Sequence, residues 1–216
     1  MKKRLIAITI VMSAALSLGA CGSKEVKSEK NVTTTAQSES IVETDTVSDT
    51  EADDSKTGEI VDNNDMTKIP VITDKDLNYT GDIGPIKYSI DAIQVSKLTA
   101  KSDQYASLLD TEIGKEVTLV ALSVTAENTS EDKINFHIDQ SKLTTNTKEQ
   151  VEPNYLISDY IDGEYLGQVI HSGTIMYILP NTNADDITSI KMYITRPSDS
   201  SYQFIGEDAV VELNFE

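Results

Sequence analysis

The sequence predicts an all-β fold, an antiparallel β-sandwich, preceded by a signal peptide and a disordered acidic tether. Residues 77–216 contain about seven apolar segments separated by turn-forming residues, which is typical of a sandwich of short strands. No long segment in this part of the chain carries the apolar period of a helix. The chain before residue 77 has two other compositions, and each predicts a separate role.

Residues 1–20 have the composition of a secretory signal. The chain begins with the basic residues Lys2, Lys3 and Arg4, and residues 5–18 are apolar apart from small hydroxyl residues. A basic start, a short apolar run and small residues at its end are the three parts of a signal peptide. The run is too short to span a bilayer, which takes about 20 apolar residues. We therefore expect residues 1–20 to be a lipoprotein signal peptide that directs export.

Cys21 is the only cysteine in the chain, and it ends the stretch Leu18-Gly19-Ala20-Cys21. This stretch resembles the lipobox of bacterial lipoproteins, which implies that Cys21 is lipidated and becomes the mature N-terminus. Two acyl chains on Cys21 would hold the protein stably to the outer face of the bacterial cytoplasmic membrane. The alternative is ordinary cleavage after Ala20, which would release a freely secreted protein. With no second cysteine, the domain has no disulfide and depends on an apolar core.

Residues 21–76 are expected to form the lipidated start and the disordered tether. Residues 22–76 are rich in Ser, Thr, Asp and Glu and contain 14 acidic and 6 basic residues. Such a segment buries too little apolar surface to offset its ordering entropy, and its charges repel one another. At ~3.6 Å per residue its contour reaches about 200 Å, enough to raise a domain into a cell wall. The alternatives are a glycosylated segment or one that folds on a partner.

The net charge argues against one class of partner. The formal net charge is −18, and residues 1–20 carry three basic and no acidic residues. The chain from Cys21 onward therefore has 36 acidic and 15 basic residues, a net charge of −21. A surface this acidic repels nucleic acid and anionic polymers. We expect no nucleic-acid binding.

The folded part, residues 77–216, is predicted strand by strand. Residues 86–91 alternate apolar and polar, and the alternation then shifts by one residue, which predicts a β-bulge. Residues 117–126 are apolar in both phases, which predicts a central strand with a covered or partly shielded outer face. Ser102 is placed to cap a short helix within residues 102–109. The other predicted strands are residues 134–138, a hairpin between Leu143 and Val151, and residues 167–179, 187–195 and 209–215.

Residues 82–216 resemble a known family in their packing and turn features. The matching features, in chain order, are the turn Asn128-Thr129, the short strand 134–138, Leu143, a polar hairpin, Pro153, and a strand from Gly173 to Pro180. The pattern is similar to that of Gram-positive surface lipoproteins with an immunoglobulin-like domain of unknown function, sometimes labelled telomeric repeat-binding factor 2. It also resembles the fold of a secreted mycobacterial antigen. The resemblance implies an immunoglobulin-like sandwich at the cell surface, while the telomere label conflicts with the acidity of the chain.

No catalytic residue is predicted. His137 and His171 lie inside predicted strands without a nearby Ser or Cys nucleophile, and the sequence carries none of the common hydrolase, zinc or phosphate-binding motifs. A hydrolase that assembles a site around His137 or His171 from distant residues is an alternative, because geometry and not order defines a triad. We expect a protein that is not an enzyme and that needs no cofactor.

Calcium is the metal that so acidic a chain would bind most readily, because calcium is coordinated by oxygen ligands. Asp159, Asp162 and Glu164 form one acidic loop, but their spacing departs from the calcium-binding loop pattern. We predict a solvated acidic loop without a metal, and a calcium site at these three residues is the alternative.

Tyr155, Tyr160 and Tyr165 recur in one segment between two predicted strands. Loops carry many binding residues, and tyrosine offers a large contact area with a polar end. These tyrosines are the candidate binding residues for a sugar, a peptide or a cell-surface or wall protein, within a non-enzymatic interaction module. The competing interpretation, which tyrosines in such a segment fit more often, is that they pack onto the sandwich and cover its open side. Another is that the protein is a small-ligand or calcium-binding lipoprotein.

Overall fold

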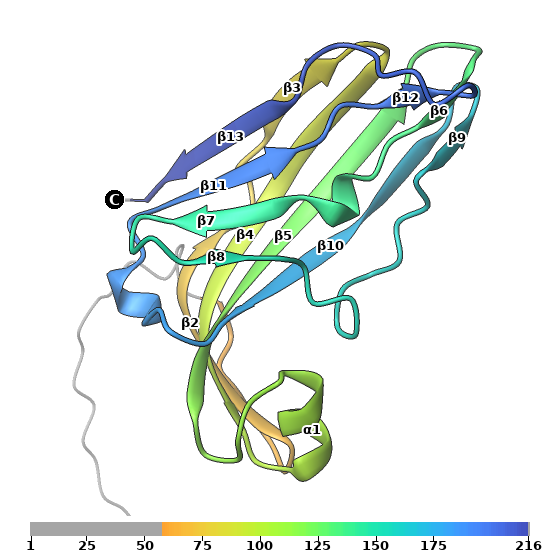
Figure 1. Cartoon of the computed structure of the whole chain (residues 1–216). Helices are drawn as coiled ribbons and strands as arrows, with labels where there is room; N and C mark the ends of the chain where they lie inside the picture. The colour runs from red at the N-terminus through yellow and green to blue at the C-terminus, as the bar shows by residue number, and fades with distance from the viewer. Residues whose placement is uncertain (1–57, 216) are drawn as a thin grey trace, which may run out of the picture. The chain divides into compact units, whose positions relative to one another are not determined.

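Long strands with alternating apolar residues build the larger of two facing layers (Figure 1). The computed structural model describes residues 58–215. The central strands of this layer are β4 (Ile86–Ala100) and β5 (Glu116–Asn128), with β10 (Ile170–Leu179) beside β5 and β2 (Met66–Asp74) beside β4. Two shorter strands complete the sheet, namely β1 (Val61–Asp62) beside β2 and β3 (Tyr79–Ile83) beside β4. All of these pairs are antiparallel.

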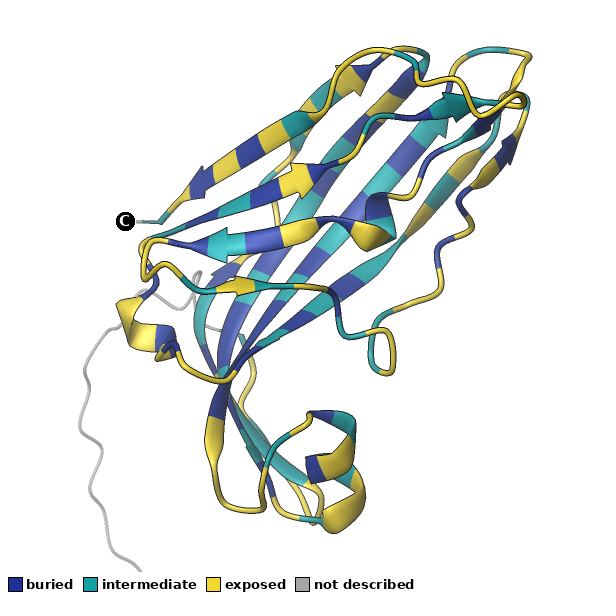
Figure 2. Cartoon of the chain, viewed as in Figure 1, coloured by how far each residue is buried: buried dark blue, intermediate teal, exposed yellow. Residues whose placement is uncertain are grey.

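Two smaller sheets make up the facing layer. One has the strand order β13 (Ala209–Asn214), β11 (Ser189–Ile194), β7 (Lys142–Thr145), β8 (Gln150–Val151). The other has the order β12 (Ser198–Asp199), β6 (Lys133–Asn135), β9 (Glu164–Leu166). Buried apolar residues of all three sheets form one core, and Figure 2 shows them alternating with half-buried or exposed residues along the strands. The predicted all-β sandwich is confirmed.

The predicted β-bulge lies in β4. Ile90 pairs with Val124 and Ala92 with Ser123, so Asp91 is the extra residue. The Asp91 side chain accepts a hydrogen bond of 2.8 Å from Thr125 Oγ1 on the neighbouring strand. The bulge lets Ile86 to Ile90 and Ile93 to Val95 face the same core, although their sequence phases differ. Along the same edge of β4, β3 pairs with the half before the bulge and β2 with the half after it.

A short helix covers part of the outer face of the large sheet. Helix α1 (Asp103–Leu108) starts at Ser102, whose side chain accepts a hydrogen bond from the Tyr105 backbone N–H, as the sequence predicted. Val117 and Leu119 alternate with core residues of β5 and therefore point to the opposite face, where they pack with Ala106 of α1. This explains why the first half of β5 is apolar in both phases. Within residues 58–215, no helix is long and apolar enough to cross a membrane.

The folded part begins earlier than the predicted boundary at residue 77, so the predicted tether 21–76 is wrong for its last residues. Strand β2 pairs with β4 from Met66 opposite Ala100 to Asp74 opposite Ile93. Val71 and Ile72 pack against the core, and Pro70 lies where the register of β2 shifts, a position that tolerates a missing N–H. Polar residues flank β2 on both sides in the sequence, so its short apolar run does not stand out as a strand of the domain. The predicted signal peptide, Cys21 and the tether up to residue 57 lie outside the described residues.

The buried side chain of Asn128 joins three parts of the fold. Its Nδ2 donates to the carbonyl oxygens of Asp132 at 2.8 Å and Gly167 at 3.0 Å, and its Oδ1 accepts from the backbone N–H of Ser130 at 3.0 Å. Asp132 directly precedes β6 and Gly167 directly follows β9, so the two bonds lie at the end of the β6–β9 pair. Asn128 therefore fixes the β5–β6 turn and brings β6 and β9 side by side.

We predict that Asn128→Ala destabilises the protein by about 2–4 kcal/mol, because the fully buried Asn128 side chain loses its hydrogen bonds to Asp132, Gly167 and Ser130. The free energy of unfolding from urea titration of the full chain measures the loss. Asn181→Ala is the matched control, since Asn181 is exposed and its side chain bonds, among residues 58–215, only to Glu149, and the change in free energy of unfolding should stay within about 0.5 kcal/mol. Equal losses in the two variants would contradict a structural role for Asn128.

Candidate functional site

The outer face of the small sheet β12–β6–β9 forms the floor of a groove of about 750 Å³. Asn135 of β6 lies opposite Glu164 of β9 on one side and opposite Ser198 of β12 on the other. These three polar side chains form a row across the floor, because cross-strand neighbours in register share a face. The neighbouring residues Ile134 and Phe136 point the other way, into the core. We refer to this feature as the aromatic groove, after the rings of Tyr160, Tyr202 and Phe204 that line it.

One wall of the groove is an extended segment that leads into β9. Burial alternates along it, with Ile161, Gly163 and Tyr165 buried and Tyr160, Asp162, Glu164 exposed. The exposed side chains face the groove, because side chains of an extended chain alternate between two sides, and the chain at Ile161 and Gly163 lies at the groove surface between them.

Hydrogen bonds to the edge of β10 fix the start of this wall. The N–H of Asn154 donates to the carbonyl of Met176 at 2.7 Å, and the N–H of Asp159 donates to the carbonyl of Thr174 at 2.9 Å. The Asp159 carboxylate in turn accepts from the N–H of Thr174 at 2.8 Å. The segment therefore covers the free edge of β10 and holds Tyr160, the next residue, in place.

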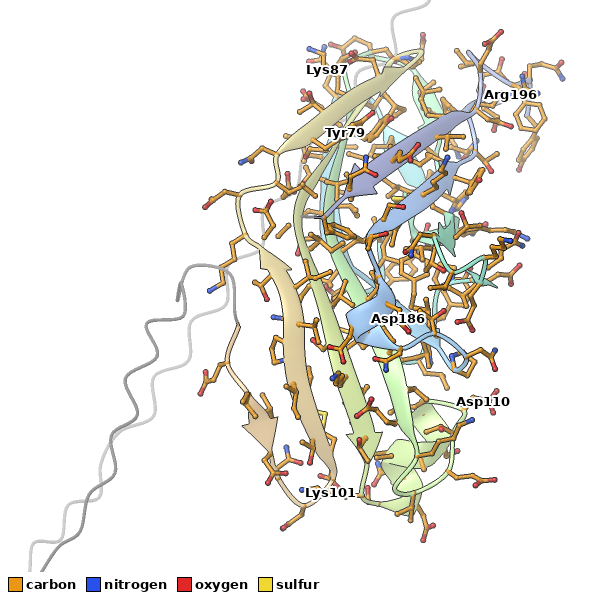
Figure 3. The ribbon with its side chains drawn as sticks, turned by 90° about the vertical axis from the view of Figure 1, so that its left-hand side faces the viewer. Tyr79, Lys87, Lys101, Asp110, Asp186 and Arg196 are labelled. Carbon is orange, nitrogen blue, oxygen red and sulfur yellow. The ribbon has the colours of Figure 1, made fainter. Side chains whose placement is uncertain are left out.

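The opposite wall comes from the chain between β11 and β13, on both sides of β12. The guanidinium of Arg196 lies 4.8 Å from the centre of the Phe204 ring, and its Nε lies 3.6 Å from the Asp208 carboxylate. Figure 3 places Arg196 at the end of the sandwich opposite Lys101 and Asp110.

Tyr202 lies at the tip of a tight turn in this wall and has a positive φ of 60°. A bulky residue rarely adopts this conformation. Here Asp199 maintains it, because its Oδ1 accepts from the N–H of Ser201 at 2.8 Å and from the N–H of Gln203 at 2.9 Å. The turn exposes the Tyr202 ring at the groove.

His137 and Asp139 close one end of the groove. They follow β6, where the 3₁₀ turn η1 (Ile138–Gln140) ends the strand earlier than the predicted 134–138. The His137 ring packs directly over Gly163, where a Cβ would lie only 2.1 Å from the ring. Burial raises the pKa of the Asp139 carboxyl, although the His137 ring, with Nδ1 at 3.7 Å from Asp139 Oδ1, acts in the opposite direction.

The structure places the three tyrosines proposed as binding residues in three different environments. Tyr160 lines the groove and is 87% exposed, while Tyr155 is 59% exposed but does not line it. Tyr165 is fully buried, so its prediction as a surface contact is wrong. Its ring packs 4.5 Å from that of His171, whose Nδ1 lies 2.6 Å from the carbonyl oxygen of Asp162. Tyr165 lies five positions after Tyr160, and an odd number of positions along an extended chain puts two side chains on opposite sides.

The structure does not support a calcium site at Asp159, Asp162 and Glu164. The Asp159 carboxylate bonds to β10, that of Asp162 accepts from the N–H of Glu164, and that of Glu164 pairs with Lys133. Across residues 58–215, no three acidic, His or Cys side chains are placed to hold a metal ion together.

Sequence reasoning missed the second wall of the groove. Tyr202 is 80% and Phe204 65% exposed, and with Tyr160 they are among the most exposed large apolar side chains of the described chain. Their signal in the sequence is two aromatic residues in a loop of Ser and Asp that has no strand alternation. Nothing in the local sequence connects this loop to Tyr160, because their place around one groove depends on pairing between β12, β6 and β9.

We predict that Tyr165→Phe leaves the free energy of unfolding near its wild-type value at neutral pH. The Tyr165 hydroxyl is buried and has no hydrogen-bond partner within residues 58–215, so its removal breaks no bond. Burial, with the carboxylates of Asp139 and Asp162 as smaller causes, raises the pKa of Tyr165 to about 12. An unfolded tyrosine ionises near pH 10. Because the folded-state pKa is higher than the unfolded-state pKa, the free energy of unfolding is unaffected by this titration below about pH 10 and falls as the pH rises from 10 towards 12. Tyr165→Phe removes the titrating group, so its free energy of unfolding should fall less over the same range.

Tyr177→Phe is the matched control for Tyr165→Phe. Tyr177 is equally buried, but its hydroxyl donates to the Ser141 carbonyl at 2.9 Å. Its removal should cost about 1 kcal/mol or more at neutral pH. Urea unfolding curves of both variants between pH 7 and pH 11 provide the comparison. A larger loss in Tyr165→Phe than in Tyr177→Phe at neutral pH would show that the Tyr165 hydroxyl is bonded.

Comparison with known proteins places the chain near others whose function is unknown. It is 27% identical over 151 residues to the SPbeta prophage-derived uncharacterized lipoprotein YonS of Bacillus subtilis (strain 168), an alignment that covers 69% of this chain and 66% of that protein. The fold is similar to that of a functionally unknown protein from Listeria monocytogenes EGD-e, with a TM-score of 0.55, 12% identity, and coverage of 69% of this chain and 88% of that one. No family model matches the chain, so the resemblance to the immunoglobulin-like lipoprotein family stays a prediction. The similarity to YonS supports the prediction of a lipoprotein.

Proposed function

We propose that this protein is a surface lipoprotein, anchored through Cys21 to the outer face of the bacterial cytoplasmic membrane, that binds a cell-surface or wall protein in the aromatic groove. The observation that carries the proposal is the exposure of Tyr160, Tyr202 and Phe204 around one groove. Clusters of exposed apolar side chains that are rimmed by polar residues mark interaction sites, and aromatic residues dominate the binding energy of many interfaces.

The shape of the site supports a binding role. Both walls are fixed by hydrogen bonds, one by the edge of β10 and the other by Asp199, so little conformational freedom is lost when a partner binds. The strained backbone at Tyr202 is typical of functional positions, because it is retained only where the surroundings maintain it. The location at the membrane is supported by the lipobox-like stretch ending at Cys21 and by the lipoprotein relative.

The proposal includes the absence of catalysis. His171 has a structural role, since its ring packs on Tyr165 and its Nδ1 lies within hydrogen-bonding distance of the Asp162 carbonyl oxygen. His137 lines the groove, and its nearest carboxylate, at 3.7 Å, lies beyond hydrogen-bonding distance. A partner that is cleaved by the wild-type chain, but not by His137→Gln, would contradict this part of the proposal.

A photo-cross-linking residue in place of Tyr202, expressed on intact cells, should capture the partner. Tyr160→Ala or Phe204→Ala in the same chain should lower the affinity for the purified partner about tenfold, because each removes an aromatic contact. Both side chains are exposed, so the unfolding midpoint should not change.

Ile113 provides the matched control. It is 51% exposed and lies in the loop between α1 and β5, away from the groove. A cross-linker at position 113 should not capture the partner that is captured at position 202 and whose binding Tyr160→Ala weakens. If positions 113 and 202 capture the same molecule equally, or if Phe204→Ala binds as well as wild type, the groove is not the binding site.

A further inference from the structure

The charges that line the aromatic groove do not balance within the protein. Its two permanently basic side chains already have acidic partners outside the groove, Lys142 with Glu152 at 2.8 Å and Arg196 with Asp208 at 3.6 Å. Of its three carboxylates, only that of Glu164 has a basic partner of this kind, Lys133. Asp139 has the His137 ring at 3.7 Å, and Asp162 forms no ion pair within residues 58–215. The uncompensated charge of the groove is negative.

Two buried polar atoms close to these carboxylates have no hydrogen-bond partner within residues 58–215. One is Asp139 Oδ1, an acceptor without a donor, and the other is the hydroxyl of Tyr165, a residue that is fully buried. The Tyr165 hydroxyl is near enough to Asp139 and Asp162 for both carboxylates to raise its pKa. Buried polar atoms of native proteins are nearly always bonded, so each exception needs an explanation. Asp139 Oδ1 is itself closed to solvent, but the Asp139 side chain as a whole is 18% exposed and lines the groove, so a donor from a bound molecule would meet Asp139 from that exposed side.

We propose that the aromatic groove binds a Lys or Arg side chain of a partner protein, with its aliphatic part against Tyr160 and Tyr202 and its charged end towards Asp139 and Asp162. This inference rests on the proposed function and names the chemistry of the partner. Aromatic rings attract cations through their faces, and a basic side chain offers several N–H donors to carboxylates.

The chain as a whole favours the same partner. From Cys21 onward it carries 36 acidic and 15 basic residues, and a field of this sign accelerates the approach of a cationic surface. A neutral sugar would also stack on exposed aromatic rings, but it would leave the charge of Asp139 and Asp162 uncompensated. A polyanionic partner would be repelled. The observations therefore favour a basic protein segment.

NMR titration of the isotope-labelled full chain, with Cys21→Ser to keep it free of lipid, tests the proposal. The probe is the blocked peptide acetyl-Gly-Lys-Gly-amide, and the comparison probes carry norleucine or Glu in place of Lys. The Lys peptide should cause saturable shifts of Asn135, Asp162 and Gly163, while the other two peptides should not. Raising the salt concentration should weaken its binding, because the contact is between charges.

Asp139→Asn should weaken binding of the Lys peptide about tenfold, since a charge-assisted hydrogen bond is replaced by a neutral one. The variant keeps the shape of the side chain and removes a charge that is partly buried, so it should fold. Asp110→Asn is the matched control, because Asp110 is exposed and lies at the opposite end of the sandwich (Figure 3). It should bind like wild type.

Three outcomes would overturn the inference. The first is a Lys peptide that shifts the whole surface without saturation, and the second is equal binding by Asp139→Asn and wild type. The third is groove shifts caused by the neutral sugar chitotetraose but not by the Lys peptide. In each case the proposed binding function still stands if Tyr160→Ala and Phe204→Ala lose the cross-linked partner, so the two failures are distinguishable.

Discussion

The hydrogen bonds of the buried Asn128 side chain are the constraint on which the groove depends. A strand of three residues such as β6 or β9 has too few ladder bonds to hold its register alone. Asn128 supplies what they lack, because it bonds to the carbonyl before β6 and to the carbonyl after β9. Gly167, whose φ of 84° suits glycine, lets the chain turn away directly after that second bond. The floor of the groove is thus attached to the end of β5, the central strand of the large sheet.

The large sheet could be predicted from the sequence because its signals are local. The phase shift after residue 91 indicated the bulge that the structure has at Asp91, and the apolar residues in both phases of β5 indicated a covered outer face. Ser102 indicated the start of α1 in the same way. Strand β2 lies outside the predicted domain, because its short apolar run adjoins a long acidic segment and contains Pro70. Its place in the sheet is decided by pairing with β4, which is a contact between distant residues.

The candidate site was predictable only in part. The spacing of tyrosines predicts Tyr160 correctly as a surface residue but places Tyr165 on the same surface, because tyrosine content alone does not include the alternation of an extended chain. The buried residues Ile161 and Gly163 carry that alternation, and they could have shown that Tyr165 faces the core. Tyr202 and Phe204 were not identified, since a strand as short as β12 has no readable pattern and its partner β6 lies more than 60 residues earlier. Sites built from such short strands depend on tertiary pairing.

Tyrosine labelling on intact cells tests the account most directly. Tyr160 and Tyr202, at 87% and 80% exposure, should be the most reactive described tyrosines of the purified full chain, followed by Tyr155 at 59%. If the aromatic groove is the binding surface, iodination on cells that contain the partner should leave Tyr160 and Tyr202 largely unmodified, while Tyr155 reacts as it does in the purified chain. Equal modification of Tyr160 and Tyr202 in the two settings, with protection elsewhere on the domain, would contradict the account.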